Sequence, residues 1–269
     1  MWLVDPFDSS GTEVAGREDA RRFLLQRTDG VRRQSPDDPE QAMALAQDVG
    51  RLIVPLDHAA CLIAHAGMSF GAYRAAWAEA SERVRDRFQP GVSLHTRMMT
   101  PTWLVTYEAL DAEARTLLAV LSFFSPAPVP CAVFVALGES LAAAYRARLD
   151  TLAAVGFVRI APDGADFRVQ GLVQRLTRHT IGAEQVRANL TAALVWMDFA
   201  FAGAVDSPDL RSRFEPLVPH VEQIVAAGES GAIASPTATL MRALGRFHAA
   251  LGGQNVAASW LARAQALEG

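Results

Sequence analysis

FVRIAPDGADFRVQ, residues 157–170, carries the clearest structural signal in this sequence. Two short apolar runs flank Pro162, Asp163 and Gly164, and a Pro-Asp-Gly centre between such runs is typical of a turn that joins two antiparallel strands. Most of the remaining chain has apolar residues at helical spacing. The stretch therefore predicts a β-hairpin within an otherwise helical protein.

Helices are predicted on both sides of this hairpin. The acidic residue Asp111 stands where an N-cap is expected. Pro126 and Pro128 suit the entry of the helix that follows them, because proline is tolerated before and in the first turn. The expected helices span residues 100–110, 111–125, 126–138, 140–156 and 171–181. Helices, then a hairpin, then another helix is the order of a winged-helix domain, which we expect over residues 99–182.

In the N-terminal part, the sequence pattern predicts a short strand-like run in MWLVDPF (residues 1–7), a helix over 17–27 and then a helical bundle. Gly50 and Gly67 suit helix ends, and Ser69 suits an N-cap. The bundle helices are expected over 39–50, 56–67 and 69–88, and a linker is expected over 89–101. In the third helix the side chains predicted to share one buried face are Phe70, Tyr73, Trp77 and Ala80.

The C-terminal part is predicted to be helical throughout. Pro216 and Pro219 should break the second of its helices. The expected helices span 184–203, 209–228, 235–253 and 255–269. The predicted fold class is mainly α: a helical bundle, a winged-helix domain with a short β-hairpin, and a helical hairpin. The expected segments are 1–34, 35–98 (bundle), 99–182 (winged helix), 183–234 (linking helices) and 235–269 (hairpin).

Composition excludes several classes of function. The net charge of −4 and pI of about 5.9 give no electrostatic footprint for nucleic acid or anionic membranes. No apolar run is long enough to span a bilayer and MWLVDPF lacks signal-peptide features, so we expect no membrane association and a cytoplasmic location. Cys61 and Cys131 lie in apolar segments and are predicted to be buried free thiols.

The residue types also argue against catalysis. All 25 basic residues are arginine. A P-loop and a Schiff base both need lysine, so this chain can form neither. Asp57 and His58 are neighbours on a predicted helix and point about 100° apart, which is poor geometry for an acid–base pair. His58 and His65 could share a helix face, but no third ligand is evident, and we expect no metal site.

The order of these segments resembles the C-terminal half of bacterial NB-ARC-type STAND signalling ATPases that carry tetratricopeptide (TPR) repeats. Residues 2–28 look like the end of the nucleotide-binding domain of that family, and residues 40–77 look like its small helical ARC domain. Residues 102–130 with 167–179 are similar to its winged-helix domain. Residues 213–224 match the helix that leads into the repeats, and residues 240–269 are similar to a first TPR unit.

The resemblance also implies positions that sense nucleotide. Ile53 stands where the family has a proline that packs near adenine, and Pro55 lies two residues further along. Gln170 stands where the family has a histidine that reads the β-phosphate of ADP. The family's Walker A loop and Mg²⁺-binding carboxylate are expected before residue 1. We therefore expect no enzyme activity and no cofactor in this chain, although the intact family binds ADP or ATP, and a separate ATPase chain could supply the missing half.

The resemblance implies a regulatory and interaction module that relays signals through domain packing. One TPR unit cannot bury its own apolar face, so Leu261, Ala264 and Leu267 are expected to be exposed and to meet a protein partner or a second copy. One alternative is a winged-helix transcription regulator, although Asp163 and Asp166 at the tip of its hairpin should repel phosphate. A second alternative is residual ADP binding in the cleft between the ARC and winged-helix domains.

Overall fold

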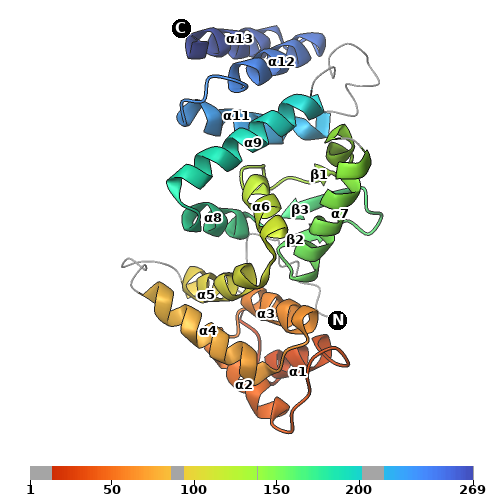
Figure 1. Ribbon diagram of the computed structural model, residues 1–269, viewed down its shortest axis with the longest axis vertical. Coiled ribbons are helices and arrows are strands. Elements are labelled where there is room, and N and C mark those ends of the chain that lie inside the picture. The colour runs from red at the N-terminus through yellow and green to blue at the C-terminus, as the bar shows by residue number, and fades with distance from the viewer. Residues whose placement is uncertain (1–13, 86–93, 138, 202–214, 269) are drawn as a thin grey trace. The chain divides into compact units, whose positions relative to one another are not determined.

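The computed structural model describes residues 14–85, 94–137, 139–201 and 215–268, and it is mainly helical with one small sheet, as predicted (Figure 1). The strand-like run expected at residues 1–7 and the helical turns expected at 209–214 lie outside these ranges. Contacts divide the chain into two compact units. In the described segments no helix has both the length and the apolar character needed to cross a membrane.

The first unit comprises Met1–Arg115 and Thr151–Phe157. Its core includes the predicted face of one helix, since Phe70, Tyr73, Trp77 and Ala80 are all buried. Ser69 begins that helix as predicted, because its Oγ accepts a hydrogen bond from the Ala72 N–H at 3.2 Å. The helices are α1 (Arg17–Arg27), α2 (Asp38–Asp48), α3 (Ile53–Ala66), α4 (Phe70–Arg85) and α5 (Leu94–Ala109).

Helix α3 begins at Ile53, three residues before the start expected at residue 56, and it ends where the sequence predicted. Pro55 is the third helical residue, so its missing N–H falls where a helix has no internal acceptor. The first internal bond runs from the Leu56 N–H to the Leu52 carbonyl at 3.0 Å. Gly67 ends the helix with φ 61° and ψ 27°, the left-handed conformation that glycine adopts without strain.

The start of α5 differs from the prediction. The helix expected over residues 100–110 begins at Leu94 and contains Pro101. The part of the expected linker that the structure describes is therefore helical, and the expected boundary between residues 98 and 99 lies inside α5. A single proline removes one backbone donor. This loss is offset by burial of the helix on both sides of it, as Met99 and Trp103 are at most 1% exposed.

The second unit comprises Thr116–Asp150 and Val158–Gly269. Its sheet contains a strand that the sequence did not predict. Residues 126–138 were expected to form one helix, but residues 129–130 form a strand and residues 131–137 a 3₁₀ helix. Pairing with the hairpin draws this segment out of an α-helix, since the Cys131 N–H donates to the Ala165 carbonyl at 2.8 Å. The elements are α6 (Ala112–Leu121, begun in the first unit), β1 (Val129–Pro130), η1 (Cys131–Leu137), α7 (Glu139–Ala154), β2 (Val158–Ile160), β3 (Asp166–Val169) and α8 (Gly171–Thr180).

The predicted hairpin is confirmed. Strands β2 and β3 are antiparallel, with Arg159 opposite Arg168, and the strand order of the sheet is β1-β3-β2. In the turn, Gly164 has φ 69° and its N–H donates to the Ala161 carbonyl at 2.8 Å. The succession of helix, strand, short helix, helix and hairpin is that of a winged helix.

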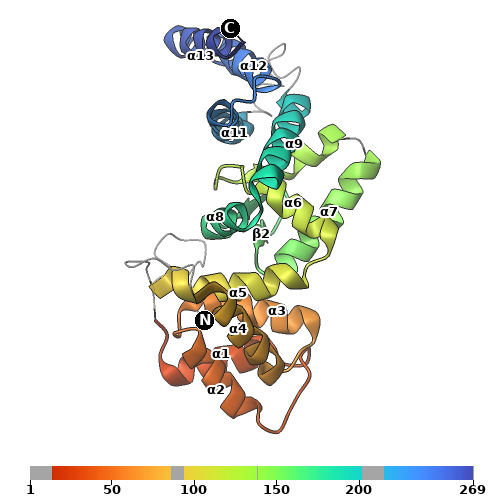
Figure 2. The same cartoon turned by 60° about the vertical axis from the view of Figure 1, so that its left-hand side comes forward.

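In the described part of the chain, four helices and one 3₁₀ turn complete the second unit. Pro216 lies in a 3₁₀ turn and Pro219 in the first turn of the helix that follows, while the residues before 215 of the helix expected over 209–228 lie outside the described ranges. Figures 1 and 2 both show the last two helices side by side and antiparallel. The elements are α9 (Ala183–Phe201), η2 (Glu215–Leu217), α11 (Val218–Ser230), α12 (Thr237–Ala250) and α13 (Gln254–Glu268).

Candidate functional site

Helices α12 and α13 form a hairpin whose close approach depends on small residues. A Cβ atom on Gly245 would lie 3.0 Å from Leu261 Cγ and 3.2 Å from the Ala257 carbonyl oxygen. Glycine is therefore the residue that leaves room for the second helix at this crossing. Ala257, Trp260 and Ala264 are buried and recur every three or four residues, so one face of α13 packs on α12.

Two arginine–glutamate ion pairs involve the hairpin. Arg242 near the start of α12 donates to both oxygens of Glu268 at the end of α13, at 2.7 and 2.9 Å. Arg263 of α13 pairs with Glu229 of α11 at 2.7 Å, and its guanidinium lies 4.2 Å from the centre of the Trp260 ring. Because these side chains are largely exposed to solvent, the pairs contribute little to the stability of the hairpin. They set which residues face each other more than they hold the helices together.

The hairpin keeps an apolar exposed surface. Leu251 is 57% exposed, Val256 47% and Leu261 41%. Leu267 is half-buried. The expectation that Ala264 lies on the open face is wrong: it is fully buried, because it lies one turn from Trp260 and two turns from Ala257 on the face that meets α12.

The three positions implied to sense nucleotide lie at helix starts. Ile53 is the half-buried first residue of α3, and Pro55 is buried two residues later; both belong to the first unit. Gln170 is the buried N-cap residue of α8 in the second unit, and its carbonyl accepts the Gln174 N–H at 3.0 Å. Their proposed role stays a prediction.

Asp57 and His58 each contact another part of the first unit. Asp57 is the fifth residue of α3 and its carboxylate approaches the guanidinium of Arg27 on α1 at 3.8 Å. His58 is 2% exposed and its ring lies 5.6 Å from that of Phe157. Nearby, burial raises the pKa of the Cys61 thiol to about 12. Cys61 and Cys131 are buried free thiols, as predicted.

The winged helix presents charge of both signs. Arg159 and Arg168 are exposed and face each other across β2 and β3. Asp163 at the tip accepts the Ala165 N–H at 3.0 Å, and Arg146 of α7 donates to the Gly164 carbonyl at 3.3 Å. Arg146 is thus engaged by the turn of its own domain.

Sequence reasoning missed the polar contacts of the hairpin. The pairing of Arg263 with Glu229 joins residues 34 positions apart, which no helical spacing predicts. The small residues Gly245 and Ala257 were the one available signal, because glycine in the middle of a helix is costly unless a neighbour needs the space.

The comparisons with known proteins place the chain in no family. A scan against models of protein families found no match, and a search of curated proteins found none.

Proposed function

We propose that this protein is a non-catalytic regulatory and interaction module of the STAND signalling type, acting in the cytoplasm, whose contact surface for a protein partner or a second copy is the α12–α13 hairpin. The spacing within the hairpin supports this. In a TPR unit large residues and a glycine follow the pattern W-x₂-L-G-x₂-Y, with A-x₃-F on the second helix. Here the corresponding residues are Met241, Leu244, Gly245, His248, Ala257 and Leu261.

Packing at these positions is the observation that carries the proposal. Met241, Leu244 and Ala257 are at most 3% exposed, and Leu261 lies over Gly245. Gly245, Ala257 and Leu261 thus meet where the two helices cross, and such a crossing is what the pattern encodes in a repeat unit. Repeat units bury their remaining apolar side chains against neighbours. Leu251 and Val256 are the exposed apolar side chains of this hairpin that a neighbouring unit would bury.

Light scattering after size-exclusion chromatography tests this proposal. We expect association that increases with protein concentration and that weakens when Leu251 and Val256 are both changed to serine. Ala258→Ser, on the exposed part of α13, is the matched control and should change nothing. A protein that stays monomeric at all concentrations, and that binds no more hydrophobic dye than the double variant, would count against the proposal.

DNA binding is a second candidate because the order of elements in the second unit is that of a winged helix, with two arginines opposed on the hairpin. A fluorescence titration with mixed-sequence DNA at low salt separates the two candidates, since phosphate contacts are strongest there. Binding that Arg159→Ala and Arg168→Ala weaken would favour this candidate. No binding at micromolar protein would exclude it.

Residual ADP binding is a third candidate from the resemblance. Binding to the folded state raises its stability by about 2.7 kcal/mol at a hundredfold excess over Kd. We expect no change of the melting temperature in millimolar ADP, because Ile53 and Gln170 differ from the sensing residues of the resembled family. A stabilisation that Gln170→Ala removes would instead support nucleotide sensing.

A further inference from the structure

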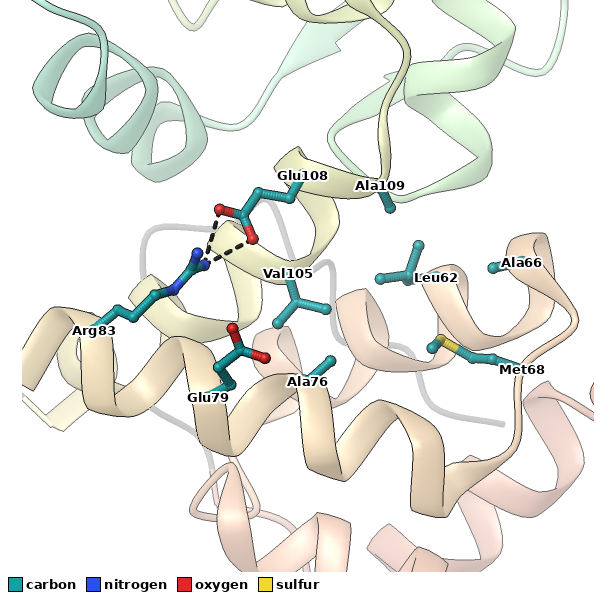
Figure 3. A pocket seen from close by; sticks show the side chains of 9 residues that line it. All are labelled: Leu62, Ala66, Met68, Ala76, Glu79, Arg83, Val105, Glu108 and Ala109. Atoms are coloured by element: carbon teal, nitrogen blue, oxygen red, sulfur yellow. Dashed lines mark hydrogen bonds and ion pairs between the residues drawn. The ribbon is translucent and has the colours of Figure 1, made fainter.

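An apolar recess opens in the first unit between α3, α4 and α5 (Figure 3). Its volume is about 260 Å³. The side chains of Leu62 and Val105 are buried at its base, while Met68 is half-buried at its side. Alanines form much of the remaining wall, namely Ala66, Ala76 and Ala109. The recess exists because these small side chains leave space between three packed helices.

Charged groups stand at the mouth of the recess. Arg83 of α4 donates to both carboxylate oxygens of Glu108 on α5, at 2.8 and 2.7 Å. This bond raises the pKa of the Arg83 guanidinium, and the charges of Glu108 and Glu79 raise it further. Glu79 lines the same recess but forms no salt bridge with any residue that the structure describes. Two carboxylates and one guanidinium give the mouth one net negative charge.

The size of the recess indicates what could enter it. Pockets for drug-sized ligands and cofactors occupy about 300–1,000 Å³. This recess is smaller, and its base is lined by aliphatic groups only. It therefore suits one aliphatic side chain better than a cofactor. The mouth attracts a cation, and the ion pair between Arg83 and Glu108 is about half exposed, so it gives little resistance to rearrangement.

We propose that this recess docks a helical protein segment that inserts one aliphatic side chain and places an arginine or lysine, one helical turn away, against Glu79. Side chains three or four residues apart share one face of a helix, so one segment can satisfy both contacts. The proposal concerns a different surface from the α12–α13 hairpin and does not depend on it.

A second hollow on the first unit serves as an internal comparison. It lies along α1 and α2 and has a volume of about 410 Å³. Its charged lining residues are Arg17, Arg21, Glu18 and Glu40. Because these two positive and two negative groups cancel, this hollow has no net charge and gives no preference for a cation. Glu40→Gln is therefore a matched control for Glu79→Gln.

Two short helical peptides on an alanine–glutamine background test the proposal by fluorescence anisotropy with the full chain. One carries a leucine with an arginine four residues later, and the other has glutamate in place of that arginine. We expect the arginine peptide to bind more tightly. Glu79→Gln should weaken its binding by about threefold to fivefold, the upper range for one exposed ion pair, while Glu40→Gln leaves it unchanged.

Filling the recess provides an independent test. Ala76→Leu places a large side chain in the recess and should abolish binding of the arginine peptide. Ala75→Leu adds the same side chain at an exposed position of α4 and should leave binding intact. Equal binding of the two peptides, no binding of either, or equal effects of the two leucine variants would each overturn the proposal. Because Glu79→Gln changes an exposed residue, it remains informative if Ala76→Leu does not fold.

Discussion

Gln174 shows how a single buried side chain can join two segments of the winged helix. Its Nε2 donates to the Leu121 carbonyl at 3.1 Å and to the Phe124 carbonyl at 2.9 Å, where α6 ends. Carbonyls at a helix end have no partner within the helix. Each carbonyl also has a second donor, the Phe124 N–H for Leu121 at 3.1 Å and the Gln223 Nε2 for Phe124 at 3.2 Å. The Gln174 amide adds to these bonds and joins α8 to the end of α6.

Replacing Gln174 by methionine should lower the free energy of unfolding by about 0.5–1.5 kcal/mol, because the shape is kept while two buried carbonyls each lose one of their two donors. Denaturant unfolding measures this difference. Gln185→Met, at an exposed position in α9, is the control and should stay within about 0.5 kcal/mol of the unchanged protein. Equal stability of the two variants would show that other donors replace Gln174.

His220 should make the stability depend on pH. Burial lowers the pKa of this histidine, although the hydrogen bond between its Nε2 and the Pro128 carbonyl at 2.9 Å opposes the shift. The unfolded chain therefore binds a proton more readily than the folded protein. Stability should be fully present above a pH of about 6.5 and should fall as the pH drops below that value.

Thermal melting at a series of pH values between mildly alkaline and mildly acidic tests this dependence. His220→Gln should show a smaller loss of melting temperature on acidification. His179→Gln is the control, because His179 is exposed at the end of α8. A variant and a control that lose equal stability would assign the acid sensitivity to other groups.

Among elements, the sequence predicted best where local chemistry decides the structure. The start of α4 at Ser69, the end of α3 at Gly67 and the turn at Gly164 each follow from one residue and its nearest neighbours. Strand β1 was missed because it is two residues long and exists through pairing with β3, far away in sequence. The start of α5 was missed because tertiary burial outweighs the cost of Pro101.

The candidate site was predicted only in part. Helical spacing located the hairpin and Leu261, but it could not tell which face of α13 meets α12. That choice depends on Gly245, whose missing side chain brings the helices together and buries Ala264. The recess among α3, α4 and α5 could not be predicted from the sequence. It arises where small side chains from three helices leave space, and such an arrangement has no sequence motif.

Gly245→Leu tests the role of this glycine. Leucine is a good helix former, so the change favours an isolated helix. In the protein its side chain would collide with Leu261 and the Ala257 carbonyl, and we expect a net loss of about 1–3 kcal/mol. Ala262→Leu on the exposed side of α13 should be near neutral. Chemical denaturation compares the two variants, and a stabilised Gly245→Leu protein would contradict the packing argument.

At the scale of the whole molecule, the first unit is discontinuous in sequence. Residues 151–157 belong to it although the chain on both sides belongs to the second unit. Within the first unit, Phe157 packs near His58, and a Cβ on Gly156 would lie 3.4 Å from Cys61 Sγ. A cut at residue 115 therefore removes part of the cover over α3.

The reactivity of the Cys61 thiol measures how far residues 151–157 cover α3. In the intact chain it is 7% exposed and its pKa is raised to about 12, so it should react slowly with a disulfide reagent. In a fragment of residues 1–115 the cover is missing, and we expect much faster labelling. The intact chain is measured as the Cys131→Ser variant, so that each sample has one thiol. Equal labelling rates would show that residues 151–157 do not protect the thiol.

The contact of Arg263 with the Trp260 ring allows tryptophan fluorescence to report on the packing of the hairpin. A cation over an indole ring and the burial of that ring both change its fluorescence, and Glu229 of α11 holds the cation in place. A variant that keeps Trp260 as its single tryptophan would thus give an emission signal for the seating of α13 on its neighbours. Titrating any partner of the hairpin against that signal would record docking without a label.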